Sequence, residues 1–282
     1  MRPFSRVFSI VIFAGAASNL SAVGNHARET SEEGSAGGSS LFAENESLQV
    51  IPTRPGVTVS IAMSKPRVTP IAAVVLFSGG NGSLKLSKTG FGSGAENFLI
   101  RARQQFTQAG YVVAIGDAPS DRMNGLDGFR TRESHAEDVK AIVSWLTVRW
   151  RTPIYLIGTS RGTISACNAV ARNGGRNISG LILTASVTAG NRESLADVAL
   201  EKIKVPTLLV HHRQDACHAS PYDGARALLE RLGGPKEMET ISGGDPPQSN
   251  PCGSISHHGF LGVESQVVES IVGWIQRHPA HD

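Results

Sequence analysis

The sequence predicts an α/β fold, with a mostly parallel central sheet and helices on both faces. Short runs of consecutive apolar residues recur along the chain, as in AAVVLF at residues 72–77. Such runs are typical of strands that are buried on both faces of a parallel sheet. Amphipathic stretches with helical spacing lie between these runs. The alternation of strands and helices favours right-handed crossovers, which leave successive strands parallel.

Eight stretches are predicted to form strands. The first two, at residues 47–51 and 57–62, are joined by a Pro-Gly turn. Five continuous apolar runs and one weaker run follow, at residues 72–77, 111–115, 154–157, 180–184, 207–210 and 238–241.

Five stretches are predicted to form helices. Three of them are residues 96–109, 163–171 and 222–232. The other two carry apolar residues with the spacing of one helix face. These residues are Val139, Ile142, Val143 and Leu146 in the first, and Val267, Ile271, Trp274 and Ile275 in the second.

The composition is that of a globular protein with a sizeable core. The chain has 282 residues, of which 40% are hydrophobic and 18% charged, and its formal net charge is +3. Its Lys and Arg residues are scattered rather than clustered. This pattern argues against a nucleic-acid surface and against a polybasic membrane patch.

The N-terminal residues are typical of a secretory signal peptide. Arg2 and Arg6 precede the apolar run VFSIVIFAGAA at residues 7–17, and small residues follow. The alternative is a membrane anchor, but this run is too short to span a bilayer. We therefore expect a signal peptide at residues 1–22, a flexible linker rich in Gly, Ser and Glu at 23–46, and one catalytic domain at 47–282. The mature protein would be periplasmic or extracellular, without stable membrane insertion.

The segment GTSRG at residues 158–162 lies between a predicted strand and a predicted helix. In that context Gly-x-Ser-x-Gly is typical of a nucleophile elbow, a sharp turn that presents a serine hydroxyl to substrate. Gly158 and Gly162 allow the strand and the helix to approach closely. The helix N-terminus directs free N–H groups toward the same point. We therefore expect Ser160 to be a nucleophile.

A serine hydroxyl needs a nearby base, and the base needs an orienting acid. In a parallel sheet such groups come from loops at the carboxyl ends of the strands. Asp215 follows the strand at residues 207–210, and Asp245, after the last strand, is an alternative acid. His257 and His258 lie in the loop before the last helix, and either one could be the base.

With these residues the chain resembles the α/β-hydrolase superfamily over residues 47–278. The likeness rests on GTSRG, on Asp215 and on His-Gly-Phe at residues 258–260, in the family order Ser, Asp, His. It implies Ser160 as nucleophile, His258 as general base and acid, and Asp215 as orienting acid. It also implies an oxyanion hole made by the N–H groups of Arg161 and of a residue in the loop SGGNG at residues 78–82.

In that loop Gly80 is the expected donor, and Asn81 is the alternative. Many family members have His-Gly where this chain has Ser78-Gly79. The segment between residues 184 and 205 is too short for a large cap domain, so the site is expected to be open. The side chain of Arg161 is either solvated or selects substrates with an acidic group.

We expect the protein to cleave carboxylic esters of small molecules. An amidase or peptidase with the same triad is an alternative, as is a binding protein on a hydrolase scaffold. No cofactor or metal is implied by these residues, because the chain has no CxxC or His-Cys cluster typical of zinc.

Three cysteines remain to be placed. Cys217 lies two residues after Asp215, and Cys252 lies six residues before His258. If the acid and the base meet, their loops run close together, so a disulfide between these two cysteines is expected. Cys167, in the predicted helix at residues 163–171, is then a buried free thiol.

Overall fold

An eight-stranded sheet forms the centre of the domain in the computed structural model, which describes residues 38–190 and 193–279. Its strand order is β11 (Lys236–Ile241), β10 (Thr207–His212), β9 (Gly180–Thr184), β8 (Ile154–Thr159), β4 (Ala72–Phe77), β7 (Tyr111–Gly116), β3 (Val57–Ser64) and β2 (Glu46–Arg54). Strand β3 pairs antiparallel with β2 and β7, and the other neighbours are parallel. The predicted mostly parallel sheet is confirmed.

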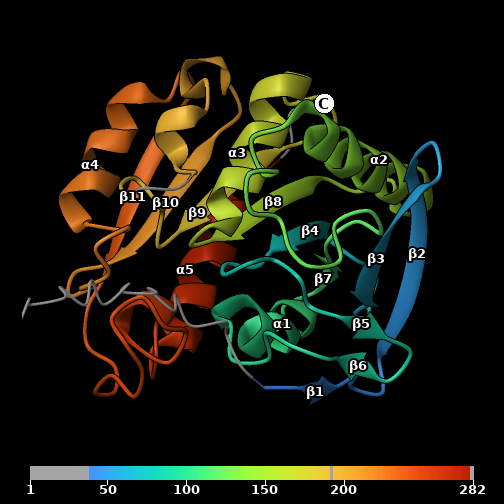
Figure 1. The fold of residues 1–282 in the computed structure, drawn as a ribbon, viewed down its shortest axis with the longest axis horizontal. Coiled ribbons are helices and arrows are strands. Elements are labelled where there is room, and N and C mark those ends of the chain that lie inside the picture. The colour runs from blue at the N-terminus through green and yellow to red at the C-terminus, as the bar shows by residue number, and fades with distance from the viewer. Residues whose placement is uncertain (1–37, 191–192, 280–282) are drawn as a thin grey trace, which may run out of the picture. The chain divides into compact units, whose positions relative to one another are not determined.

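Helices cover both faces of this sheet, as predicted. Helices α2 (Glu133–Trp150), α3 (Gly162–Asn173) and α4 (Tyr222–Arg231) lie on one face, and α1 (Phe98–Gln108) and α5 (Glu264–Arg277) lie on the other (Figure 1). A hydrophobic core lies on each face of the sheet, and alternate residues of each central strand point into one core or the other. In β4, Val75 packs into the core with α2 and α3, whereas Val74 packs into the core with α1 and α5. All six residues of β4 are buried, which explains its continuous apolar sequence.

A second, three-stranded sheet was not predicted. It has the order β1 (Ser40–Leu41), β6 (Gly90–Phe91) and β5 (Leu86–Ser87), and both pairings are antiparallel. Each of these strands has two residues, too few for a recognisable period.

The part of the predicted linker that the structure describes packs against the domain. The ring of Phe42 contacts Phe91 edge-on, and the largely buried carboxylate of Glu46 lies 2.7 Å from Nε of Arg103. The domain therefore begins before residue 47. The sequence did not indicate this, because the polar composition of the segment does not reveal a buried ion pair. The predicted signal peptide and linker residues 23–37 lie outside the described residues.

The segment between β9 and β10 contains no large cap among its described residues. These residues form two short 3₁₀ helices, Leu195–Asp197 and Leu200–Lys202. Within the described part of the chain, every helix is too short or too polar to cross a membrane.

Candidate active site

Ser160 lies at the tip of a tight turn between β8 and α3. Its φ is +52°, a left-handed conformation that non-glycine residues seldom adopt. Two neighbours hold it there. The N–H of Ser160 donates to the carbonyl oxygen of Thr184 at 2.9 Å, and its own carbonyl accepts from the N–H of Thr163 at 3.0 Å. The backbone therefore fixes the serine at the carboxyl end of the sheet.

The two glycines of the turn are required by close packing. A Cβ on Gly158 would lie 2.5 Å from the carbonyl oxygen of Gly162. A Cβ on Gly162 would lie 2.0 Å from the carbonyl oxygen of Phe77, at the end of β4. Both contacts are far inside van der Waals distance, so only glycine lets α3 begin directly against the sheet.

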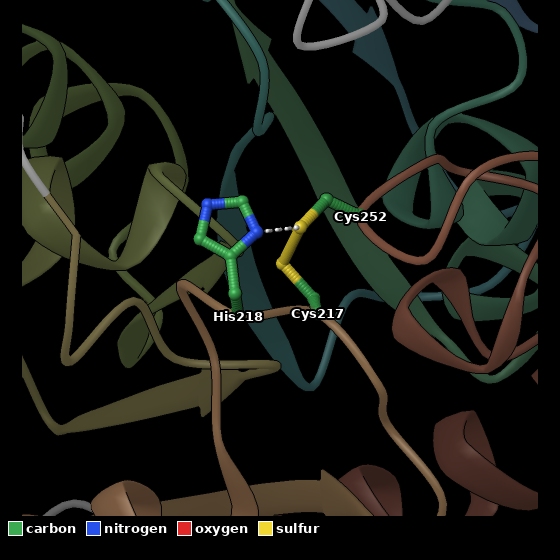
Figure 2. Close-up of side chains that lie close together, drawn as sticks. All are labelled: Cys217, His218 and Cys252. Carbon is green, nitrogen blue, oxygen red and sulfur yellow. Dashed lines mark hydrogen bonds between the residues drawn. A yellow bond between two sulfur atoms is a disulfide. The ribbon is translucent and has the colours of Figure 1, made fainter. Parts of the chain in front are cut away.

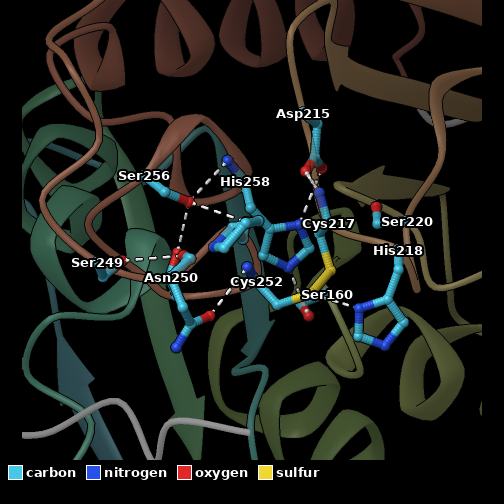
Figure 3. The surroundings of a disulfide bond; sticks show 12 residues. Ser160, Asp215, Cys217, His218, Ser220, Ser249, Asn250, Cys252, Ser256 and His258 are labelled. Carbon is cyan, nitrogen blue, oxygen red and sulfur yellow. Dashed lines mark hydrogen bonds and ion pairs between the residues drawn. A yellow bond between two sulfur atoms is a disulfide. The ribbon is translucent and has the colours of Figure 1, made fainter. Parts of the chain in front are cut away.

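His258 faces the serine hydroxyl from the loop before α5 (Figure 3). It lies in a short 3₁₀ helix, His257–Gly259, which is capped by the side chain of Ser256 accepting from the His258 N–H at 3.1 Å. Arg101 on α1 donates to the carbonyl oxygen of Gly259 at 2.8 Å. With the loop held in this way, Nε2 of His258 lies 2.9 Å from Oγ of Ser160.

His257 and Asp245, the alternative base and acid, lie elsewhere. The ring of His257 stacks on His212, with ring centroids 4.6 Å apart and an interplanar angle of 5°. Asp245 is exposed. Of the two adjacent histidines, it is His258 that the structure brings to Ser160.

Asp215 completes the chain of hydrogen bonds. Its Oδ2 lies 2.8 Å from Nδ1 of His258, and its Oδ1 accepts from the N–H of Cys217 at 2.9 Å. Burial acts to raise the pKa of Asp215, but the hydrogen bond and charge of His258 and the Cys217 N–H outweigh it, so its pKa is lowered. An ionised Asp215 accepts a hydrogen bond from the Nδ1–H of His258, which keeps the proton on Nδ1 and leaves the lone pair of Nε2 directed at the serine.

A disulfide joins the loop that carries Asp215 to the loop that carries His258. Cys217 and Cys252 are bonded, with Cα atoms 4.5 Å apart (Figure 3). Nδ1 of His218 lies 3.6 Å from Sγ of Cys252. Figure 2 shows the ring of His218 beside the disulfide. These three residues form a cluster with metal-ligand chemistry within the described residues, but the disulfide engages both sulfurs. Cys167 is a free, buried thiol whose pKa is raised by burial.

The loop after β4 lies directly beside the serine. A Cβ on Gly79 would lie 2.8 Å from Cβ of Ser160. Gly80 follows with a φ of +59°. Neither the N–H of Gly80 nor that of Arg161 has an acceptor within the described part of the chain. A free amide directly after the nucleophile and a second one in the loop beside it are what an oxyanion hole needs.

The side chain of Arg161 is buried rather than solvated. Its NH1 lies 2.5 Å from Oδ1 of Asp127, and its NH2 lies 3.8 Å from Oε2 of Glu193. Its NH1 also lies 3.4 Å from the carbonyl oxygen of Gly80. Carboxylates from two distant loops neutralise it, a pairing that local sequence does not reveal.

His211 is a neighbour of the site that the sequence did not single out. This buried side chain lies with Nε2 3.0 Å from the carbonyl oxygen of Ser220 and 3.6 Å from Oδ2 of Asp215. Burial lowers its pKa, although Asp215 acts in the opposite direction. A neutral His211 therefore packs beside the carboxylate. The sequence HHRQD at residues 211–215 contains it, but carries no spacing that distinguishes it from His212.

The chain was compared with known proteins. No known family model matches it, and no curated protein does. Among solved structures, a serine hydrolase without a lid from Xanthomonas campestris is similar, with a TM-score of 0.59 at 15% identity, covering 86% of this chain and 99% of that one.

Two further solved structures are also similar. Est1E from Butyrivibrio proteoclasticus has a TM-score of 0.55 at 16% identity and covers 82% of this chain and 98% of its own. A thermostable carboxyl esterase from Bacillus coagulans has a TM-score of 0.57 at 13% identity and covers 84% of this chain and 99% of its own. Likeness at these identities concerns the architecture, and it shows that the chain has the α/β-hydrolase fold.

Proposed function

We propose that the protein is a serine hydrolase that cleaves carboxylic esters of small molecules. One observation carries this proposal: Ser160, His258 and Asp215 form a continuous chain of hydrogen bonds, 2.9 Å and 2.8 Å long, from three separate loops. Geometry of this kind is the working arrangement of a catalytic triad.

In the proposed reaction Ser160 Oγ attacks the ester carbonyl carbon, while Nε2 of His258 takes the hydroxyl proton. The carbonyl oxygen becomes an oxyanion, which the N–H groups of Gly80 and Arg161 stabilise. His258 then gives its proton to the departing alcohol, and an acyl-enzyme remains. A water molecule then attacks the acyl carbon while His258 takes its proton. His258 returns this proton to Oγ of Ser160, which releases the acid and restores the serine hydroxyl.

Asp215 has a fixed role in this cycle. It keeps the Nδ1 proton of His258 in place and stabilises the positive ring formed when Nε2 is protonated. The Cys217–Cys252 disulfide supports that role, because it ties the segment after Asp215 to the segment before His258.

The names of the similar structures favour esters over amides as substrates. One of them is described as a carboxyl esterase, and one as a serine hydrolase without a lid. The described residues between β9 and β10 form only short 3₁₀ helices, so an open site without a lid is expected here too. We further propose that the protein is exported, since a disulfide and a signal-like N-terminus suit an oxidising compartment.

Turnover of matched substrates tests the proposed function. The wild type and Ser160→Ala are given a panel of esters with varied acyl length and charge, together with the corresponding amides. We expect the wild type to hydrolyse esters faster than amides, and Ser160→Ala to hydrolyse neither. Faster turnover of amides indicates an amidase or peptidase, and no turnover by the wild type indicates a binding protein.

A further inference from the structure

A buried arginine braces the loop that follows β4. Arg130 is 1% exposed and lies in the turn before α2. Its NH2 donates to the carbonyl oxygens of Ser78 at 3.3 Å and of Gly80 at 3.2 Å. Its NH1 donates to Oγ of Ser165 on α3 at 2.8 Å. One guanidinium therefore links the loop beside Ser160 to the helix that begins after Ser160.

The loop is shaped around this guanidinium. A Cβ on Gly82 would lie 2.6 Å from NH2 of Arg130, so the last glycine of SGGNG allows the loop to pass over the arginine. Ser78, Gly79 and Gly80 have small or absent side chains, which contribute few contacts of their own. The hydrogen bonds from Arg130 therefore fix the path of this segment, together with NH1 of Arg161, which also donates to the carbonyl oxygen of Gly80.

The charge of Arg130 is not directly paired. No carboxylate in the described part of the chain lies within ion-pair distance of it. Burial, and after it the nearby charge of Arg161, lower the pKa of Arg130, while the more distant charges of Glu193 and Asp127 act in the opposite direction. Arg161 differs, because it contacts Asp127 and lies near Glu193. A buried charge held mainly by backbone carbonyls is costly for folding, which favours a functional reason for its presence.

We propose that Arg130 is a positioning residue of the site. It holds the 78–80 loop against α3, so that the Gly80 amide reaches the oxyanion formed during ester cleavage, and its unpaired positive charge favours that oxyanion. The inference rests on the proposed function. It predicts that Arg130 acts on the transition state more than on bound substrate, because the oxyanion exists only after Ser160 has attacked.

Four variants separate this role from general support of the fold. Arg130→Met removes the charge and the hydrogen bonds, and Arg130→Lys keeps the charge. Ser165→Ala removes one anchor of the guanidinium and leaves the charge intact. Arg172→Met is the matched control. Arg172 lies on α3, as Ser165 does, and donates to the carbonyl oxygen of Thr131, but it does not contact the 78–80 loop.

Three quantities are measured for each variant: kcat, KM for one ester, and the inhibition constant of a trifluoromethyl ketone. The ketone forms a tetrahedral oxyanion with the serine and so mimics the transition state. For Arg130→Met we expect kcat to fall by about 10- to 100-fold, somewhat less than the loss of a whole oxyanion donor. KM should change little, and ketone affinity should fall in parallel with kcat.

The other variants separate the contribution of the positive charge of Arg130 from that of its hydrogen bonds. Arg130→Lys should recover part of the loss, Ser165→Ala should show a smaller loss in the same direction, and Arg172→Met should match the wild type. Wild-type kcat and ketone affinity in both Arg130→Met and Ser165→Ala would overturn the inference. If Arg130→Met does not fold, wild-type values in Arg130→Lys and Ser165→Ala together would do so.

The result for the unmodified protein keeps the two proposals apart. If the wild type is active and the Arg130 and Ser165 variants keep wild-type kcat and ketone affinity, only the role of Arg130 is contradicted. Wild type without turnover or ketone binding contradicts the proposed function, and the inference fails with it.

Discussion

At the scale of single residues, two adjacent histidines have different surroundings. His258 lies 2.9 Å from Ser160 and 2.8 Å from Asp215, whereas His257 stacks on His212. We expect His258→Ala to lower kcat by about 10⁴-fold or more, as loss of a triad member commonly does. His257→Ala should keep most of the activity. Both variants are assayed on one ester, and a reversed order of the two effects would contradict the assignment of the base.

The glycine that opens α3 gives a second prediction. Gly162→Ala places a methyl group against the carbonyl oxygen of Phe77, so strand and helix must separate. We expect the free energy of unfolding to fall by about 1–3 kcal/mol, as for other overpacked sites, and kcat to fall because Ser160 moves with the turn. Denaturant unfolding and ester turnover measure the two effects.

Gly116→Ala is the control for this substitution. Its methyl group would lie 3.9 Å from Cδ1 of Ile142, which is an ordinary contact. Equal stability and activity in the two alanine variants would show that close packing at Gly162 is not what the turn requires.

At the scale of elements, α2 carries a buried, uncharged histidine. Neither nitrogen of His135 has a partner in the described residues. Burial, with the charges of Arg130 and Arg54, lowers its pKa from 6.5 to about 3. Between these values the unfolded chain binds a proton that the folded protein does not. The stability that depends on neutral His135 is therefore complete above pH 6.5 and is lost as the pH falls toward 3.

His135→Phe removes this titration and keeps a ring against Phe129. The wild type should lose about 1.4 kcal/mol per pH unit more than the variant between pH 6 and 4. Urea unfolding at several pH values measures the difference. The pKa values of His211 and His212 are also lowered, but both proteins keep these residues, so parallel pH curves would contradict the prediction for His135.

The loops that carry Asp215 and His258 are the other elements that can be tested. The disulfide joins residues 35 positions apart, and closing a loop of this length stabilises a protein by about 3–4 kcal/mol in the chain-entropy model. Cys217→Ser with Cys252→Ser should lower the free energy of unfolding by this amount and should also lower kcat. A thiol reductant should lower the free energy of unfolding and the kcat of the wild type, and should leave both quantities unchanged in the double variant. A reductant effect of equal size in both would contradict this account.

At the scale of the whole molecule, the sequence predicted the sheet, its helices and the residues that meet at Ser160. These features leave local signals: continuous apolar runs such as residues 72–77, helical spacing, and Gly-x-Ser-x-Gly between a strand and a helix. The order of Ser160, Asp215 and His258 along the chain added a global signal, because each follows a strand of one sheet.

Other features depend on contacts between distant residues and could not be predicted. The pairing of β1 with β6 involves two residues on each side. The partners of Arg161 lie in loops around Asp127 and Glu193, far from it along the chain. Arg130 reads as an ordinary polar residue in GFRTR, and only the fold shows that it reaches the loop after β4. Pairing of charged side chains has no period that a sequence displays.

The central claim is that Ser160 is an activated nucleophile, and covalent labelling tests it most directly. The folded protein is treated with a fluorophosphonate, digested, and mapped by mass spectrometry. We expect one adduct, on the peptide that contains Ser160, with no adduct in Ser160→Ala and much slower labelling in His258→Ala. An unlabelled wild type, or an adduct on another residue that persists in Ser160→Ala, would contradict the account.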